Sequence, residues 1–112
     1  MKEQITYDIF DKVDIRIGTV ISVKQNEKAR KPSLVIEVDF GKEIGVRKSS
    51  AQVTNYTIDN LLNKTCIAVV NLDYKQVGPF ISECLVLGSV DKEGKVLLLE
   101  PDFNSNLGDR VF

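Results

Sequence analysis

The chain has 112 residues, of which 43% are hydrophobic and 28% charged, and this composition suits one globular domain with a buried core. Its formal net charge of −1 argues against a protein that holds nucleic acid by bulk positive charge. The sequence contains no apolar run long enough to span a membrane and no secretory signal pattern, so we expect a cytoplasmic protein without membrane insertion.

The first third of the chain predicts a turn of helix at 7–13 followed by a strand. Hydrophobic and polar residues alternate over 13–24, which is the period of a half-buried strand, with Gly18 as a bulge or bend. The residues expected on the inner face of this strand are Val13, Ile15, Ile17, Ile21 and Val23. A polar loop that ends at Pro32 follows.

Two further strands form a predicted hairpin. Residues 34–40 alternate again, and the side chains expected to point inward are Leu34, Ile36, Val38 and Phe40. Gly41 and Lys42 make a tight connection to the third strand, where Ile44 and Val46 continue the inward pattern.

The second half predicts one short helix and more strands. At 56–63 the period changes to that of a helix, with Thr57 as its cap and Ile58, Leu61 and Leu62 on one face. Residues 65–72 are apolar on both faces, which is typical of a central strand. Another strand is expected at 83–90, a turn at 91–94 and a short strand at 95–101, before a turn-rich tail that ends in Val111 and Phe112.

This order of elements predicts an all-β fold with small helical content. Five short strands with a helix between the third and fourth match the connectivity of a five-stranded OB-fold barrel. The helix should close one end of the barrel with Leu61 and Leu62, and the N- and C-terminal segments are extensions. No repeat or linker interrupts the chain, so we expect a single domain over 1–112.

The sequence argues for a binding protein instead of an enzyme. It contains no histidine, the commonest general base, and no GxSxG, P-loop or GxGxxG motif. Cys66 and Cys84 both lie in apolar runs, so we expect buried thiols and neither a disulfide nor a zinc site. We expect no metal and no cofactor.

Basic residues are concentrated in one part of the chain. Residues 24–48 carry seven basic and four acidic side chains, whereas residues 90–112 carry three basic and five acidic ones. The first segment forms either a local basic patch on a slightly acidic protein or a solvated loop whose lysines serve solubility.

Several motifs resemble a known family. VDIRIGTV at 13–20, SSAQ at 49–52 and NLDYKQVGPFISECLVLG at 71–88 are similar to the tRNA-binding OB domains found beside some aminoacyl-tRNA synthetases. Within that superfamily, DFGKEIGVRKSSAQVT at 39–54 and KTCIAVVN at 64–71 resemble the CsaA family of small bacterial export-related chaperones. The resemblance implies a homodimer that binds unfolded or precursor polypeptides and works with the preprotein translocase motor. Its wider superfamily implies tRNA binding as the alternative.

The candidate binding residues lie in two segments. Strands two and three and the flanking loops form the ligand face of an OB barrel, so residues 47–52 and the loop 71–83 should converge on one groove. The candidate contacts for a polypeptide or tRNA are Lys48, Ser49, Ser50, Gln52, Asn71, Lys75, Phe80, Ile81, Ser82 and Glu83.

The chemistry of this set favours an extended polypeptide. Uncharged polar groups bind a peptide backbone of any sequence, and Phe80 and Ile81 add apolar contact. Single-stranded nucleic acid needs stacking aromatics and a basic track. Here Lys75-Gln76 carries one basic residue where the family pattern has two, and Gly78–Ile81 is more apolar than in tRNA-binding relatives.

Structural roles remain open for some of these residues. Asn71 could satisfy a turn at a strand end, and Phe80 could belong to the core or to a dimer interface. Ser82 and Glu83 could cap the loop against Lys75 or Arg47. Ser49 and Ser50 could be buried polar groups that tie the barrel closed.

The predicted strand at 95–101 has more leucines than one core can take. Three consecutive leucines cannot all face one side of a strand, so the surplus should be covered by a second subunit or by the N-terminal segment. The family resemblance implies a homodimer that is formed partly by the terminal segments. The expected dimer interface therefore consists of Ile9, Phe10, Leu97, Leu98, Leu99, Val111 and Phe112.

Overall fold

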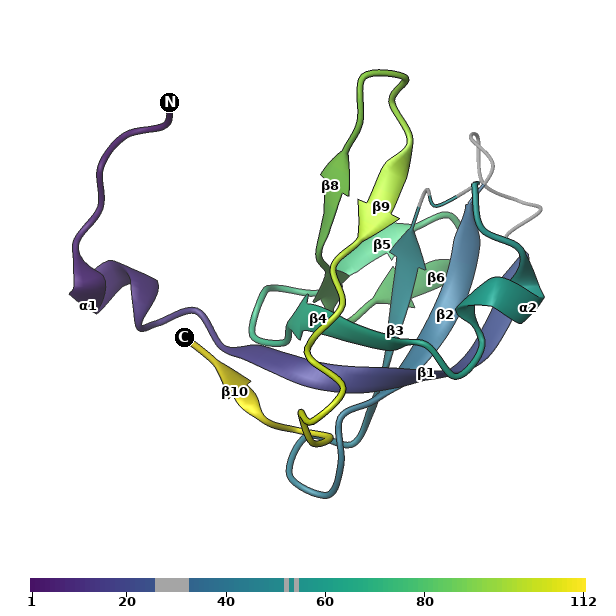
Figure 1. Ribbon diagram of the computed structural model, residues 1–112, viewed down its shortest axis with the longest axis horizontal. Coiled ribbons are helices and arrows are strands. Elements are labelled where there is room, and N and C mark those ends of the chain that lie inside the picture. The colour runs from purple at the N-terminus through teal and green to yellow at the C-terminus, as the bar shows by residue number, and fades with distance from the viewer. Residues whose placement is uncertain (26–32, 52, 54) are drawn as a thin grey trace.

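The computed structural model describes residues 1–25, 33–51, 53 and 55–112 (Figure 1). In chain order the elements are α1 (Tyr7–Phe10), β1 (Ile15–Gln25), β2 (Leu34–Asp39), β3 (Val46–Ala51), α2 (Ile58–Leu61), β4 (Thr65–Val69), β5 (Lys75–Val77), β6 (Phe80–Ser82), β7 (Leu85–Val86), β8 (Gly88–Val90), β9 (Val96–Leu98) and β10 (Arg110–Val111). The loop predicted to end at Pro32 lies outside the described residues.

The main sheet forms a nearly closed barrel. Its strands follow the order β3-β2-β1-β4-β7, all neighbours are antiparallel, and β10 pairs with the start of β1. Residues 82–84 return to the free edge of β3 and bring the two ends of the sheet together. Helix α2 lies between β3 and β4 in the chain, so the predicted OB-fold is confirmed.

The inner face of β1 differs from the prediction. Its register with β2 shifts between Val20 and Ser22, so the bulge lies at Ile21 and not at Gly18. Before the bulge Gly18 and Val20 face the core; after it Val23 does, and Ile21 is exposed. Gly18 has a different role: a Cβ there would lie 2.5 Å from Val38 and 2.8 Å from Phe40, so only glycine lets β1 approach β2 this closely.

The core of the barrel contains the predicted side chains of β2 and only some of those predicted elsewhere. Leu34, Ile36, Val38 and Phe40 are all buried together. In β3, however, Val46 is exposed and Ser49 is buried, because Ser49 lies opposite Ile36 and shares its inward face.

Helix α2 is shorter than predicted. Thr57 caps it as expected, and its hydroxyl accepts a hydrogen bond from the backbone of Asn60. Leu61 is fully buried, whereas Ile58 and Leu62 are exposed, since the helix ends before a second turn can carry Leu62 inward. Of the two leucines predicted to close this end of the barrel, Leu61 does so and Leu62 does not.

Two hairpins replace elements that the sequence predicted differently. The segment 71–83 contains the hairpin of β5 and β6, whose two-residue turn begins at Gly78 with φ of +59°. The strand predicted at 83–90 is divided: β7 pairs with β4, and β8 leaves the barrel to pair with β9. The hairpin of β8 and β9 extends beyond the barrel (Figure 1).

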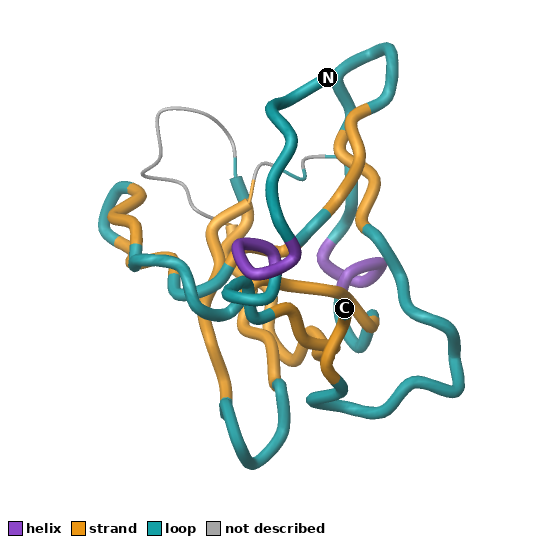
Figure 2. Tube along the Cα trace, turned by 90° about the vertical axis from the view of Figure 1, so that its left-hand side faces the viewer, coloured by secondary structure: helices purple, strands orange, loops and turns teal. Residues whose placement is uncertain are grey.

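The N-terminal segment forms an arm that stands away from the barrel. Helix α1 is capped by Thr6 and buries none of its residues. Figure 2, which views the molecule from the side of the arm, shows α1 in front of the barrel. Among the described helices, neither is long and apolar enough to cross a lipid bilayer.

Candidate functional site

The two predicted binding segments meet at a seam where β3 adjoins residues 82–84. The backbone nitrogen of Glu83 donates to the carbonyl of Lys48 at 2.7 Å, and the backbone nitrogen of Lys48 donates to the Glu83 carboxylate at 3.0 Å. The backbone nitrogen of Ser50 donates to the Ser82 hydroxyl at 3.3 Å. Four candidate residues are therefore adjacent, and we call this contact the β3 seam.

The side chains of Ser82 and Glu83 have a structural role at the β3 seam. β3 pairs with β2 along one edge, so the amides of its other edge need partners elsewhere. The Glu83 carboxylate and the Ser82 hydroxyl supply these partners in place of backbone carbonyls. The sequence predicted that Ser82 and Glu83 could cap the loop against Lys75 or Arg47. In the structure their side chains accept hydrogen bonds from the backbone of β3 instead.

The serines of β3 are poorly placed to contact a ligand. Ser49 is only 2% exposed and lies on the core face. The Ser50 hydroxyl oxygen is also buried and has no hydrogen-bond partner among the described residues. Gln52 lies outside the described residues.

The accessible groups near the seam are apolar or cationic. Ile81 is 49% exposed, Phe80 is half-buried, and Lys48 and Lys75 are exposed. Strand β6 contacts β3, so these side chains lie along one side of the barrel. This set remains the candidate surface for a ligand.

Arg47 and Tyr74 make a contact that the sequence did not reveal. The Arg47 guanidinium donates to the Tyr74 hydroxyl at 2.7 Å and lies 6.0 Å from the centre of the ring. The contact attaches the segment before β5 to β3. No local pattern in the sequence connects two residues so far apart in the chain.

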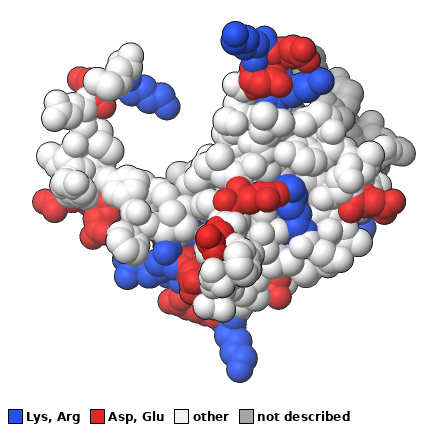
Figure 3. Space-filling model, viewed as in Figure 1, with Lys and Arg blue, Asp and Glu red and all other residues white. Residues whose placement is uncertain are grey.

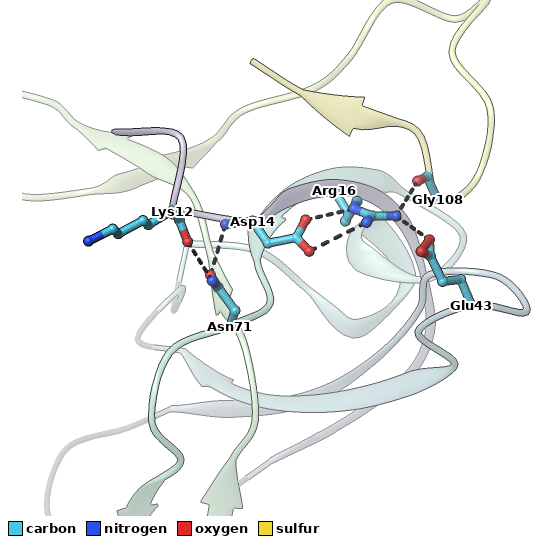
Figure 4. A network of polar contacts seen from close by, with 6 residues as sticks. All are labelled: Lys12, Asp14, Arg16, Glu43, Asn71 and Gly108. Atoms are coloured by element: carbon cyan, nitrogen blue, oxygen red, sulfur yellow. Dashed lines mark hydrogen bonds and ion pairs between the residues drawn. The ribbon is translucent and has the colours of Figure 1, made fainter. Parts of the chain in front are cut away.

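Asn71 lies at the root of the arm and not at the β3 seam. Its side-chain nitrogen donates to the Lys12 carbonyl at 2.6 Å, and its side-chain oxygen accepts from the backbone nitrogen of Asp14 at 2.8 Å (Figure 4). The structure therefore supports the alternative in which Asn71 satisfies backbone groups, here those of the arm.

Arg16 joins three distant segments beside this root. Its Nε donates to Asp14 at 2.6 Å, and its Nη1 donates to Glu43 at 2.6 Å and to the Gly108 carbonyl at 3.2 Å (Figure 4). The hydrogen bond to Glu43 and then that to Asp14 raise the pKa of the guanidinium, so Arg16 stays charged although it is buried. Nothing in the sequence pattern singled out Arg16 for this role.

A polar hollow of about 350 Å³ adjoins this network, between the arm and the chain end. It is lined by Lys12, Asp14, Arg16, Glu43 and Arg110 among others. Because Arg16 already donates to two carboxylates and a carbonyl, its charge is not available to an incoming anion.

The two cysteines are buried and unlinked. Cys66 is fully buried and Cys84 nearly so, and neither forms a disulfide. Burial raises the pKa of Cys66 to about 11 and that of Cys84 to about 12, which keeps both protonated near neutral pH. Across the described residues, no group of three histidine, cysteine or carboxylate side chains is arranged to hold a metal ion.

The predicted interface residues fall into two sets. Ile9, Phe10, Leu97, Leu99 and Phe112 are exposed. Val111 is half-buried and pairs with Ile15. Leu98 packs against the core of its own chain, so this residue was assigned to the wrong surface; it alternates with its two neighbours along β9.

Comparison with known proteins defines the family. The model of the putative tRNA binding domain matches residues 15–110. The crystal structure of the CsaA chaperone protein from Picrophilus torridus is 47% identical and has a TM-score of 0.92, over 97% of this chain and 100% of that one. The crystal structure of chaperone CsaA from Bacillus anthracis is 39% identical with a TM-score of 0.91, over 98% and 100%. The chain belongs to the tRNA-binding domain family, in its CsaA branch.

The ligases that match this chain are much longer. A methionine–tRNA ligase of Pyrococcus horikoshii is 35% identical over 97% of this chain, but the chain spans only 15% of the ligase. The CsaA structures, in contrast, are matched over their full length. The resemblance predicted from the motifs is therefore confirmed.

Proposed function

We propose that this protein is a chaperone that binds unfolded or export-bound polypeptides. The observation that carries the proposal is its likeness to two CsaA chaperone structures, which extends over the full length of both. The ligases share only a segment with this chain, so their catalytic activity gives no reason to propose catalysis here.

The accessible side chains near the β3 seam support a polypeptide ligand. Ile81 and Phe80 offer apolar area, whose burial contributes about 25 cal/mol per Å². Acidic and basic side chains are interspersed on the face drawn in Figure 3, which shows no track of one sign. A ligand recognised mainly through apolar area and backbone needs no particular sequence.

We further propose that the protein acts as a homodimer. Tyr7 is 90% exposed and Phe112 is 98% exposed, and together with Phe10 they line one hollow and form an exposed apolar cluster of the kind that marks an interaction site. The arm does not cover Leu97 of its own β9 or Leu99, which follows β9, so both also remain exposed. A second copy that packs its arm against this surface buries both sets and follows two-fold symmetry.

The second candidate function is tRNA binding. The family model and the ligase relatives favour it, and Lys48, Lys75 and the Arg47–Tyr74 pair offer cationic and aromatic contacts. We also propose a cytoplasmic location and contact with the preprotein translocase motor, on the basis of the CsaA resemblance.

Suppression of aggregation tests the two functions against each other. A denatured client protein is diluted with and without this protein, and the measurement is repeated with competing tRNA and at rising salt. The chaperone function predicts suppression that persists at high salt, because apolar contacts are not screened. Binding of tRNA without any suppression of aggregation supports the second function, and its affinity should fall steeply with salt.

A further inference from the structure

We propose that the outer edge of β5 takes up an extended segment of the bound polypeptide as an added β-strand. The inference rests on the proposed chaperone function and specifies how the client is held. Strand addition satisfies the hydrogen bonds of an unfolded backbone whatever its side chains are.

The register of the hairpin shows which groups are directed outward. The backbone amide of Glu83 points at β3, and backbone groups alternate in direction along a strand. The backbone N–H and C=O of Ile81 therefore also point toward β3, whereas those of Phe80 and Ser82 point toward β5. Their partners on β5 are Val77 and Lys75. The intervening residue, Gln76, therefore directs its backbone N–H and C=O to the outer edge.

This edge is unoccupied by any other strand of the described chain. β5 pairs with β6 and forms a sheet of two strands. The Gln76 side chain is held to the turn by a hydrogen bond from its Nε2 to the Gly78 carbonyl, at 2.6 Å. An unpaired edge of this kind is a template for a further strand.

An exposed apolar side chain lies beside the same edge. Ile81 is the cross-strand partner of Gln76 and so lies on its face of the hairpin. Ile81 is 49% exposed, so a strand added here gains apolar contact as well as hydrogen bonds.

The charge at the edge fits a polypeptide better than RNA. Asp73 and Lys75 are the charged residues next to it, and they balance each other. A phosphate backbone needs a net excess of cations along its path. The backbone of an extended peptide needs only donors and acceptors at the spacing of a strand.

A proline substitution tests the inference without disturbing the hairpin. The Gln76 amide faces outward, so Gln76→Pro removes a donor from the free edge and leaves the pairing with β6 intact. The matched control is Gln76→Ala, which loses the side chain and keeps the amide. The probe is a fluorescent, uncharged peptide of about ten residues with alternating valine and threonine, a length typical of a strand.

We expect Gln76→Pro to weaken peptide binding about tenfold, and Gln76→Ala to bind as the unchanged protein does. Circular dichroism checks that both variants are folded. Equal affinities for the proline and alanine variants would overturn the inference. An equal loss of tRNA affinity in the proline variant would also overturn it, because the edge would then serve RNA. A change in the oligomeric state of the proline variant would overturn it as well, because the edge would then serve a second copy.

A second measurement keeps the unchanged protein and modifies the peptide. N-methyl groups are placed on alternate residues, in two peptides that differ by one position. Strand addition requires one set of amides, so one peptide should lose about tenfold more affinity than the other. Equal losses would contradict strand addition, whereas failure of the unmethylated peptide to bind at all would contradict the proposed function itself.

Discussion

Lys48 and Glu83 form a reciprocal pair that closes the barrel: the amide of each donates to an oxygen of the other, at 3.0 and 2.7 Å. In a regular antiparallel pair both acceptors would be backbone carbonyls. Here one acceptor is the Glu83 carboxylate, so the closure of the barrel depends on the identity of a side chain.

Replacing Glu83 should therefore destabilise the fold. Glu83→Ala leaves the amide of Lys48 without its acceptor and should lower the free energy of unfolding by about 1 kcal/mol. Glu83→Gln retains an acceptor oxygen and should lower it less. Urea titration measures both, with Glu93→Ala on the exposed β8–β9 hairpin as control. The same loss in the glutamine and alanine variants would show that charge, and not the hydrogen bond, matters.

Gly18 and Gly45 should differ in their response to alanine. At Gly18 the added Cβ meets Val38 and Phe40 well inside contact distance, so Gly18→Ala should cost about 3 kcal/mol or more. At Gly45 nothing lies within 4 Å and φ is +80°, so Gly45→Ala should cost only about 1 kcal/mol of backbone strain. Thermal unfolding of the two variants gives the comparison, and equal losses would contradict the close packing of β1 on β2.

The buried thiols should make the fold less stable in alkali. In the folded chain Cys66 and Cys84 keep their protons to a pKa of about 11 and about 12, against an ordinary value of 9.0 in the unfolded chain. Between these values the unfolded state binds fewer protons, so stability falls as pH rises above 9. Urea titrations from pH 7 to 10 should show this decline. A variant with alanine at both positions should show a weaker one, and equal slopes would refute the assignment.

The arm should control assembly and not the fold. Tyr7→Ser combined with Phe10→Ser removes exposed aromatic area, so the variant should shift toward a single subunit in analytical ultracentrifugation while its unfolding midpoint changes little. Ile58→Ser is the matched control, because Ile58 is also exposed but lies on α2, outside the proposed interface. An unchanged sedimentation coefficient would exclude the arm from the interface.

Lysine and isoleucine substitutions should separate the two proposed ligands. Lys48→Ala and Lys75→Ala should each lower the slope of log K for tRNA binding against log salt concentration by about one in magnitude. Polypeptide binding should remain nearly unchanged in both variants. Ile81→Ser should do the reverse. Lys92→Ala, in the β8–β9 turn, is the control for net charge. Loss of polypeptide binding in the lysine variants, with Ile81→Ser unaffected, would reverse the proposed mode of recognition.

The barrel could be predicted from the sequence because a strand with one buried face shows alternating hydrophobic and polar residues. The sequence predicted β2 well for this reason. It misplaced the bulge of β1, because a glycine required by close packing resembles a glycine at a bend until its neighbours are known. It also missed the β5–β6 hairpin, whose strands are too short to display a period.

The candidate site was harder to predict than the fold. The expectation that two segments meet was correct for Lys48, Ser50, Ser82 and Glu83, since barrel topology brings them together. Asn71 was misplaced, because nothing local to it indicates that its amide meets Lys12 and Asp14. Polar side chains at strand ends serve ligands and backbone groups alike, and only their partners distinguish the two uses.

Arg16 fixes the start of β1, the β2–β3 turn and the C-terminal tail to one another, and Asn71 holds the arm to the same place. The arm thus leaves the barrel from a stiff base and not from a loose tether. Any assembly made through such arms would hold its two ligand surfaces at a set distance and angle. A flexible client could then bind both surfaces at once only if it were long enough to span them, so the particle would retain chains above a minimum length more strongly than shorter ones.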